Sequence, residues 1–278
     1  MSLRRVAVSA LIAAGVLAIA AGIATAKLQT RSKSTTIAAD ANGKATAKCP
    51  RGSEAVSGGF AAPHFDPNFS GRSILPFGSK RAGDRKWKTK GYNFASTQSG
   101  KLITYAYCDT HQPGLKVRSK TTSLQPFHPG SVTAKCPSGS EAVSGGFASP
   151  DASTGGDAVL GVASKRVSQN KWKVFAYNND PTNSQRLVAY AYCDPHQPGL
   201  QAKSKRVLVP LAKKRSVTAK CRHGSKAVSG GFAARVNGNA DGPFVFASKR
   251  ATRTKWRASA AGNGAGTHPF KVFAYCKS

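Results

Sequence analysis

Acidic residues are scarce in this chain of 278 residues. Eleven Asp and Glu stand against 42 Lys and Arg, so the formal net charge is +31. The sequence has no paired carboxylates at catalytic spacing, no H-E-x-x-H motif and no nucleophile elbow. We therefore predict that the protein is not an enzyme, and that it has no catalytic residue, no metal site and no cofactor. A catalytic site assembled across distant parts of the chain is the weaker alternative.

Long hydrophobic runs are also rare. Residues 6–24 form the one long apolar run, which follows two arginines and precedes an Ala-Thr-Ala site ending at Ala26. This arrangement is typical of a secretory signal peptide, so we predict a cleaved signal helix over 1–26. The run is longer than the ~7 to 15 apolar residues usual in such peptides, and an uncleaved membrane anchor is the minority alternative.

The six cysteines recur with regular spacing because the chain repeats itself. The stretches TAKCPRGSEAVSGGF, TAKCPSGSEAVSGGF and TAKCRHGSKAVSGGF belong to repeats over 28–114, 115–199 and 200–278, and each repeat contains two cysteines. Cysteines of an exported protein are expected to pair in the oxidising compartment where it folds. The simplest pairing stays within each repeat and joins Cys49 to Cys108, Cys136 to Cys193 and Cys221 to Cys276.

Within a repeat, hydrophobic residues alternate with a period of two. The stretches KWKVFAYN at 171–178 and RLVAYAYC at 186–193 are examples, and Gly, Pro and Asn bound such runs. This pattern predicts about six β-strands in each repeat, and we find no amphipathic helix after residue 26. The predicted fold class is all-β, with three disulfide-closed antiparallel repeats.

Two arrangements of the repeats fit this pattern. Each repeat could form a small sandwich-like domain, strung with the others like beads, or three sheets could close around a pseudo-threefold axis as a β-prism. The linkers CDTHQPGL at 108–115 and CDPHQPGL at 193–200 carry paired turn signals. We therefore favour the beads and keep the prism as the alternative.

The motif S-G-G-F lies inside a predicted strand in each repeat. It resembles a phosphate-binding loop only in its glycines, because the G-x-x-x-x-G-K-[ST] pattern and a following helix are both absent. Glycine pairs in a strand mark a bulge or the close approach of another backbone. We therefore predict a structural role for this motif.

Basic residues recur around each tryptophan. Trp87, Trp172 and Trp256 are flanked on both sides by Lys or Arg, and each follows a Ser-Lys-Arg sequence. Because successive residues of a strand point to opposite faces, we predict buried tryptophans and an exposed basic stripe that binds a polyanion. The predicted binding residues are Lys80, Arg81, Lys165, Arg166, Lys249 and Arg250.

The positive charge is uneven along the chain. The repeat over 200–278 has 17 basic residues and one acidic residue. It includes Lys213, Lys214 and Arg215, which we expect to add long-range attraction for anions. Removing the two arginines of the signal peptide lowers the net charge from +31 to +29. A charge that serves only solubility is the alternative, but it does not predict this asymmetry.

Three segments differ between otherwise similar repeats. They lie at 62–73, 149–159 and 234–243 and are rich in Asp, Asn and Gly. Loops that vary on a constant scaffold often determine binding specificity. They are the basis of an alternative function, a lectin-like protein that binds carbohydrate.

The repeated C-P-x-G-S-x-A-V-S-G-G-F, followed by a tryptophan-centred strand and Y-A-Y-C, resembles a set of secreted, largely uncharacterised bacterial proteins of actinobacterial type. The repeat logic is also similar to that of vitelline-membrane outer-layer proteins, which implies a β-prism as one candidate fold. Neither resemblance implies an activity or a functional residue.

These features predict a secreted, non-catalytic protein. Its expected partner is an anionic cell-envelope surface or a polyanionic polymer, and attachment to a cell wall is one form of this. Carbohydrate is the alternative partner, and we predict no specific recognition of nucleic acid.

Overall fold

A computed structural model describes residues 28–68, 71–111, 113–152, 159–234, 242–264 and 266–278. The regular structure in these residues consists of 18 β-strands in three antiparallel six-stranded sheets, which confirms the all-β prediction. The predicted signal peptide and its helix lie outside the described residues. None of the described residues belongs to a helix that is long and apolar enough to span a membrane.

Each repeat contributes six strands. Repeat 1 contains β1 (Gln29–Ile37), β2 (Ala41–Lys48), β3 (Glu54–Ala61), β4 (Ile74–Arg81), β5 (Lys86–Asn93) and β6 (Gly100–Asp109). Repeat 2 contains β7 (Lys116–Leu124), β8 (Pro129–Lys135), β9 (Glu141–Ala148), β10 (Val159–Ser168), β11 (Lys171–Asn178) and β12 (Gln185–Asp194). Repeat 3 contains β13 (Gln201–Pro210), β14 (Lys214–Lys220), β15 (Lys226–Ala234), β16 (Gly242–Thr252), β17 (Lys255–Asn263) and β18 (Thr267–Lys277).

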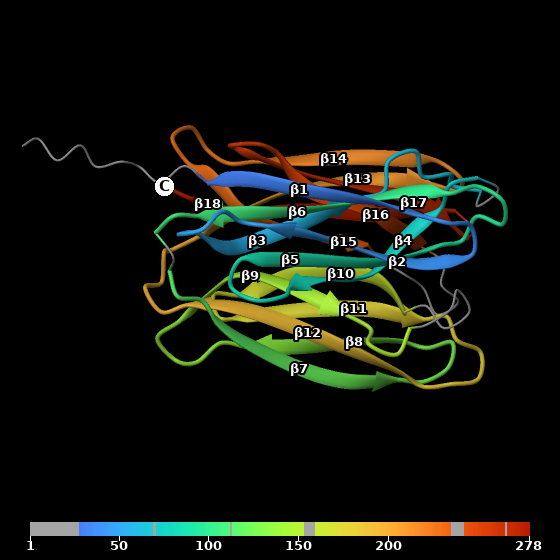
Figure 1. The fold of residues 1–278 in the computed structure, drawn as a ribbon, viewed down its shortest axis with the longest axis horizontal. Helices are drawn as coiled ribbons and strands as arrows, with labels where there is room; N and C mark the ends of the chain where they lie inside the picture. Colours follow the sequence, from blue (N-terminus) through green and yellow to red (C-terminus); the bar gives the residue numbers. More distant parts are fainter. Residues whose placement is uncertain (1–27, 69–70, 112, 153–158, 235–241, 265) are drawn as a thin grey trace, which may run out of the picture.

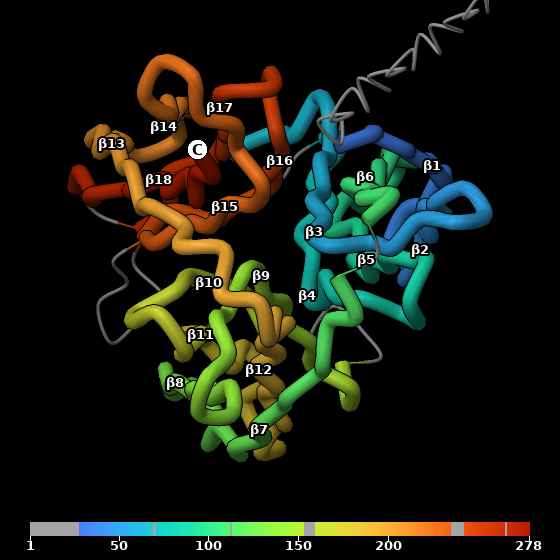
Figure 2. The backbone as a smooth tube through the Cα atoms, turned by 90° about the vertical axis from the view of Figure 1, so that its left-hand side faces the viewer, coloured from blue at the N-terminus to red at the C-terminus, as the bar shows by residue number. Residues whose placement is uncertain are grey.

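Every sheet combines three strands from each of two repeats. Sheet I has the order β1-β6-β3-β16-β17-β14, sheet II β2-β5-β4-β9-β12-β7, and sheet III β13-β18-β15-β10-β11-β8. The strands run along the long axis of the molecule (Figure 1), and the three sheets surround a central axis when seen from one end (Figure 2). The favoured bead arrangement is therefore wrong, and the alternative pseudo-threefold prism is the one that forms.

The physical reason is that no repeat can complete a sheet alone. In repeat 1, strands β1, β6 and β3 leave the edge of β3 unpaired, and strand β16 of repeat 3 covers it. The corresponding contact in sheet II joins Gly78 to Ala148 and Ser79 to Phe147. Turn-forming residues in a linker indicate only that the chain changes direction there. Both arrangements require such a change, so the linkers could not distinguish the beads from the prism.

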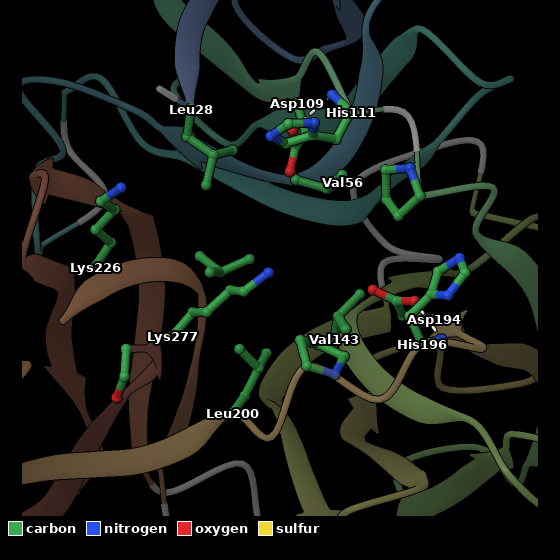
Figure 3. A pocket seen from close by; sticks show the side chains of 14 residues that line it. Leu28, Val56, Asp109, His111, Val143, Asp194, His196, Leu200, Lys226 and Lys277 are labelled. Atoms are coloured by element: carbon green, nitrogen blue, oxygen red, sulfur yellow. Dashed lines mark hydrogen bonds between the residues drawn. The ribbon is translucent and has the colours of Figure 1, made fainter. Parts of the chain in front are cut away.

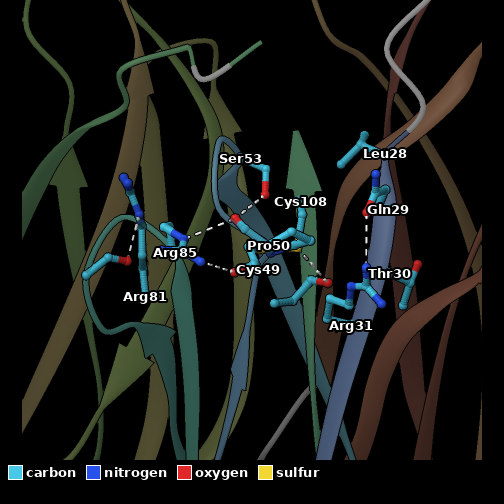
Figure 4. Close-up of a disulfide and its surroundings, with 12 residues drawn as sticks. Leu28, Gln29, Thr30, Arg31, Cys49, Pro50, Ser53, Arg81, Arg85 and Cys108 are labelled. Atoms are coloured by element: carbon cyan, nitrogen blue, oxygen red, sulfur yellow. Dashed lines mark hydrogen bonds between the residues drawn. A yellow bond between two sulfur atoms is a disulfide. The ribbon is translucent and has the colours of Figure 1, made fainter. Parts of the chain in front are cut away.

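The three disulfides pair as predicted, and the joined cysteines have sequence separations of 59, 57 and 55. Each one links two sheets at one end of the prism. Cys49 follows β2 of sheet II, whereas Cys108 belongs to β6 of sheet I (Figure 4). Disulfides persist in oxidising environments, so these bonds agree with an extracellular or secreted protein.

The tryptophans lie in the core, as predicted. Trp87, Trp172 and Trp256 are each 1% exposed. The indole nitrogen of each donates a hydrogen bond of 2.9–3.0 Å to the serine of the Ser-Lys-Arg sequence in the same repeat. The serine of that sequence therefore positions the tryptophan.

The three copies of the S-G-G-F motif pack around the pseudo-threefold axis. A Cβ on its first glycine would lie 2.2–2.3 Å from the tryptophan ring of its own repeat, and a Cβ on the second would lie 2.4–2.6 Å from a carbonyl oxygen of a neighbouring repeat. The first glycine thus allows a tryptophan ring to approach closely, and the second allows the backbone of another repeat to do so, as the glycine pair predicts.

The other two residues of the motif connect the repeats in a ring. Ser57 Oγ donates to the carbonyl of Val228 at 2.6 Å, and the equivalent serines continue the cycle from repeat 2 to 1 and from 3 to 2. The phenylalanines meet edge to face, with ring centroids 6.0–6.3 Å apart. Such aromatic pairs stabilise beyond the area that they bury.

Gly230→Ala is expected to lower the free energy of unfolding by about 1–3 kcal/mol, because overpacking forces a core ring to move. The new Cβ would lie 2.3 Å from Trp256. Denaturant unfolding measures the loss. Gly78→Ala is the matched control, since its Cβ would meet nothing nearer than 3.6 Å. Equal losses in the two variants would contradict the role assigned to Gly230.

Candidate functional site at the basic corners

Arg81, predicted to be exposed, is instead buried, with 7% of its surface accessible. Its guanidinium lies 2.6 Å from the Glu54 carboxylate and donates to the carbonyl of Leu115 at 3.2 Å. Its backbone N–H donates to the Tyr192 hydroxyl at 2.7 Å. The prediction that Arg81 belongs to an exposed stripe is wrong, because the recurring glutamate and the linker to repeat 2 take up its hydrogen bonds.

Arg166 plays the same part in repeat 2. It pairs with Glu141 and donates to the carbonyl of Leu200. Glu141 also accepts hydrogen bonds from the backbone N–H groups of Gly199 and Leu200, at 2.7 and 2.9 Å. The guanidinium is mostly buried, so the expectation of a freely exposed cation fails here too.

In repeat 3 the glutamate is replaced by Lys226, and Arg250 closes the ring of repeats. Its guanidinium donates to the carbonyl of Leu28 at 2.8 Å and to the Thr30 hydroxyl at 2.9 Å, both in repeat 1. Burial lowers the pKa of Arg250, and neighbouring Arg253 lowers it further. Arg250 is therefore also an interface residue rather than an open site.

The three lysines of the Ser-Lys-Arg sequences are half-buried on the outer faces of the sheets. Lys80 lies over the ring of Tyr190 at 4.7 Å, and its ammonium donates to the hydroxyl at 2.9 Å. Lys165 lies over Phe273 at 5.5 Å, and Lys249 over Tyr105 at 5.2 Å. Each lysine thus contacts the adjacent repeat while it adds positive charge to an outer face.

Lys213, Lys214 and Arg215 are exposed where β14 begins. Lys214 donates to the carbonyl of Phe65 in repeat 1 at 2.9 Å. The start of β14 is about 20 Å from its end, because a strand rises ~3.3 Å per residue. The structure places this cluster at one end of a prism edge, apart from the Ser-Lys-Arg residues.

Exposed cations gather instead in a groove where sheets II and III meet. The groove lies between edge strands β7 and β8 and is lined by Ser119, Lys120, Thr133, Lys135, Val167, Lys171 and Lys173. All seven residues are in the described part of the chain, and none of them is acidic. Lys135 is the strand partner of Lys171, and Thr133 that of Lys173.

The other two prism edges carry equivalent residues, with Arg257 in place of a lysine at one of them. Lys48 pairs with Lys86 and Thr46 with Lys88 between β2 and β5, and Lys220 pairs with Lys255 and Thr218 with Arg257 between β14 and β17. We call these three edges the basic corners. Their cations are Lys33, Lys48, Lys86 and Lys88; Lys120, Lys135, Lys171 and Lys173; and Lys205, Lys220, Lys255 and Arg257.

Like charges are crowded on and beside these corners. The pKa of Lys88 is lowered by partial burial and then by Lys90, Lys80 and Lys44. The pKa of Lys165 is lowered by burial and then by Lys271 and Lys173. A bound anion would relieve this repulsion, so the corners are suited electrostatically to anionic ligands.

Sequence reasoning found the cations that flank tryptophan but missed the corners. The lysines of T-A-K and of R-S-K, which is K-S-K in repeat 3, recur in every repeat, yet they lie on strands of different sheets. Their convergence depends on how the sheets meet. A regular recurrence of lysine at these positions was the available signal.

The variable loops give no second site that can be described. Residues 153–158 and 235–241 lie outside the described residues, and in the first loop Asp66 accepts backbone hydrogen bonds from Asn68 and Gly71 at 3.0 and 2.6 Å. The lectin-like function stays a prediction. No protein-family model and no curated protein matches this chain.

Proposed function

We propose that this protein is a secreted, non-catalytic binding protein that attaches to anionic polymers of a cell envelope along its three basic corners. The observation that carries the proposal is the repetition of the same four cationic positions at every corner. Repeat 2 has only nine basic residues, against 13 in repeat 1 and 17 in repeat 3, yet it keeps all four. Charge that served only solubility would not need to recur at these positions.

The corners suit a linear polyanion better than a compact ligand. Residues two apart on one strand, such as Lys86 and Lys88, point to the same face about 7 Å from one another. Each corner therefore offers a row of cations along the prism edge. Three parallel rows allow one protein to hold several chains or several segments of one chain, and such multivalency raises the overall affinity.

Calorimetric titration with a short polyphosphate, no longer than one corner, tests the proposal. The mature protein is expected to bind three such chains, with affinity that falls as salt is raised. Neutralising one corner with K120Q/K135Q/K171Q/K173Q should remove one of the three sites, through a loss of affinity there of about tenfold or more.

The matched control removes four exposed cations that are not corner residues, with R51Q/K101Q/R222Q/R253Q, and should keep three sites. If both variants lose affinity equally at every site, net charge alone drives binding and the corners are not the site. Binding to a neutral polysaccharide that resists salt would instead favour the variable loops.

A further inference from the structure

A cavity of about 550 Å³ opens at the end of the prism that carries the disulfides and the C-terminus. Val56, Val143 and Val228, which occupy the same position in the three repeats, line it together with Leu28 and Leu200 (Figure 3). Its volume and aliphatic lining are typical of sites for small molecules. The three valines place it on the pseudo-threefold axis.

The polar lining of this axial cavity breaks the threefold symmetry. Repeats 1 and 2 supply Asp109 and Asp194, whereas repeat 3 supplies Lys277 at the same position. Lys226, which replaces the recurring glutamate, is the direct cross-strand partner of Lys277 between β15 and β18. Both lysines line the cavity, and Lys277 reaches toward its centre in Figure 3.

Two lysines directly opposite one another on a sheet repel. In repeats 1 and 2 the corresponding pairs are acidic, and the glutamate of each is neutralised by a buried arginine. Among the described residues, neither Lys226 nor Lys277 forms an ion pair. The cavity therefore contains two lysines without a direct ion-pair partner among these residues, beside an aliphatic surface, and Asp109, Asp194 and Ser278 complete its polar lining.

The two aspartates that line the cavity, unlike the two lysines, have side-chain hydrogen-bond partners in the described part of the chain. Asp109 accepts the backbone N–H of His111 at 3.0 Å, and Asp194 accepts that of His196 at 2.8 Å. Although two histidines are nearby, the described residues contain no group of three side chains that could hold a metal ion. The strongly positive field of the molecule also favours entry of anions over that of amines.

We propose that the axial cavity binds a small amphiphilic anion. A carboxylate or phosphate lies between Lys226 and Lys277, and an aliphatic tail packs against the valines. This site uses none of the corner cations, so it is independent of the proposed attachment to polymers.

Octyl phosphate is the probe, and methyl NMR of the valine side chains is the measurement. The resonances of Val56, Val143 and Val228 should shift with saturation, and inorganic phosphate or octyl glucoside at the same concentration should shift them much less. K226Q/K277Q should raise the Kd for octyl phosphate by about tenfold or more. Lys277 is exposed and Lys226 is half-buried, so the variant should fold normally.

The corner variant K120Q/K135Q is the charge-matched control and should bind octyl phosphate as the unmodified protein does. The proposal is overturned if octylammonium binds equally well, if K226Q/K277Q leaves the Kd unchanged, or if the valine resonances do not respond. The control tests the corners separately from the cavity. A failure of polyphosphate to bind the corners would therefore not affect the result for octyl phosphate, and a failure of octyl phosphate to bind would not affect the proposal for the corners.

Discussion

Replacing Glu141 with glutamine is expected to lower the free energy of unfolding by about 3–5 kcal/mol, because it leaves a buried cation without its partner. The Glu141 side chain is fully buried, pairs with Arg166 and accepts two backbone hydrogen bonds from the linker to repeat 3. The glutamine amide would turn a donor toward groups that are themselves donors. Denaturant unfolding measures the loss.

A surface ion pair provides the control for this substitution. Arg186 and Asp151 form a salt bridge whose side chains are 60% and 31% exposed. Asp151→Asn should cost less than about 1 kcal/mol, since exposed pairs contribute little. Replacing both buried partners with apolar residues, in E141L/R166M, should recover only part of the loss, because the backbone N–H groups of Gly199 and Leu200 lose their acceptor. Similar losses for D151N and E141Q would show that burial is not what makes the Glu141 pair important.

Removing the Cys136–Cys193 disulfide, with C136A/C193A, is expected to lower the free energy of unfolding by roughly 4 kcal/mol in the chain-entropy model. The bond closes a loop with a sequence separation of 57 residues and joins the end of β8 in sheet III to β12 in sheet II. Thermal and denaturant unfolding of the variant, with the other two disulfides intact, measure the effect.

The same variant also tests how the prism holds together. The disulfide lies at one end of the β7–β8 corner, so its loss should loosen the groove that contains Lys135. We expect weaker polyphosphate binding at this corner and unchanged binding at the other two. A loss of less than about 1 kcal/mol would mean that sheet pairing between repeats already restricts the chain as the disulfide does.

Features that recur within the chain could be predicted from the sequence. Regular spacing gave the three repeats and the pairing of all six cysteines, and alternation of apolar residues gave the strands. The structural role of S-G-G-F and the burial of tryptophan also followed, because strand geometry and glycine sterics are local.

Contacts between repeats could not be predicted in this way. Arg81 looked like a surface cation because its partner Glu54 lies 27 residues away, and its contacts with Leu115 and Tyr192 come from the next repeat. Each residue of Ser-Lys-Arg makes its own contact. The serine accepts a hydrogen bond from a tryptophan, the lysine lies over an aromatic ring, and the arginine donates to a carbonyl between two repeats. The same recurrence fits a binding motif equally well when only the sequence is known.

The sequence by itself determined the repeats, the disulfides, the β-structure and the excess of positive charge, since each depends on local pattern or composition. Tertiary structure alone decided that the repeats share sheets, because an unpaired strand edge is satisfied only by a neighbour. It also decided which cations remain accessible. Lysines from two sheets meet at the prism edges, while the arginines expected to bind polymer are held by glutamate and backbone between the repeats.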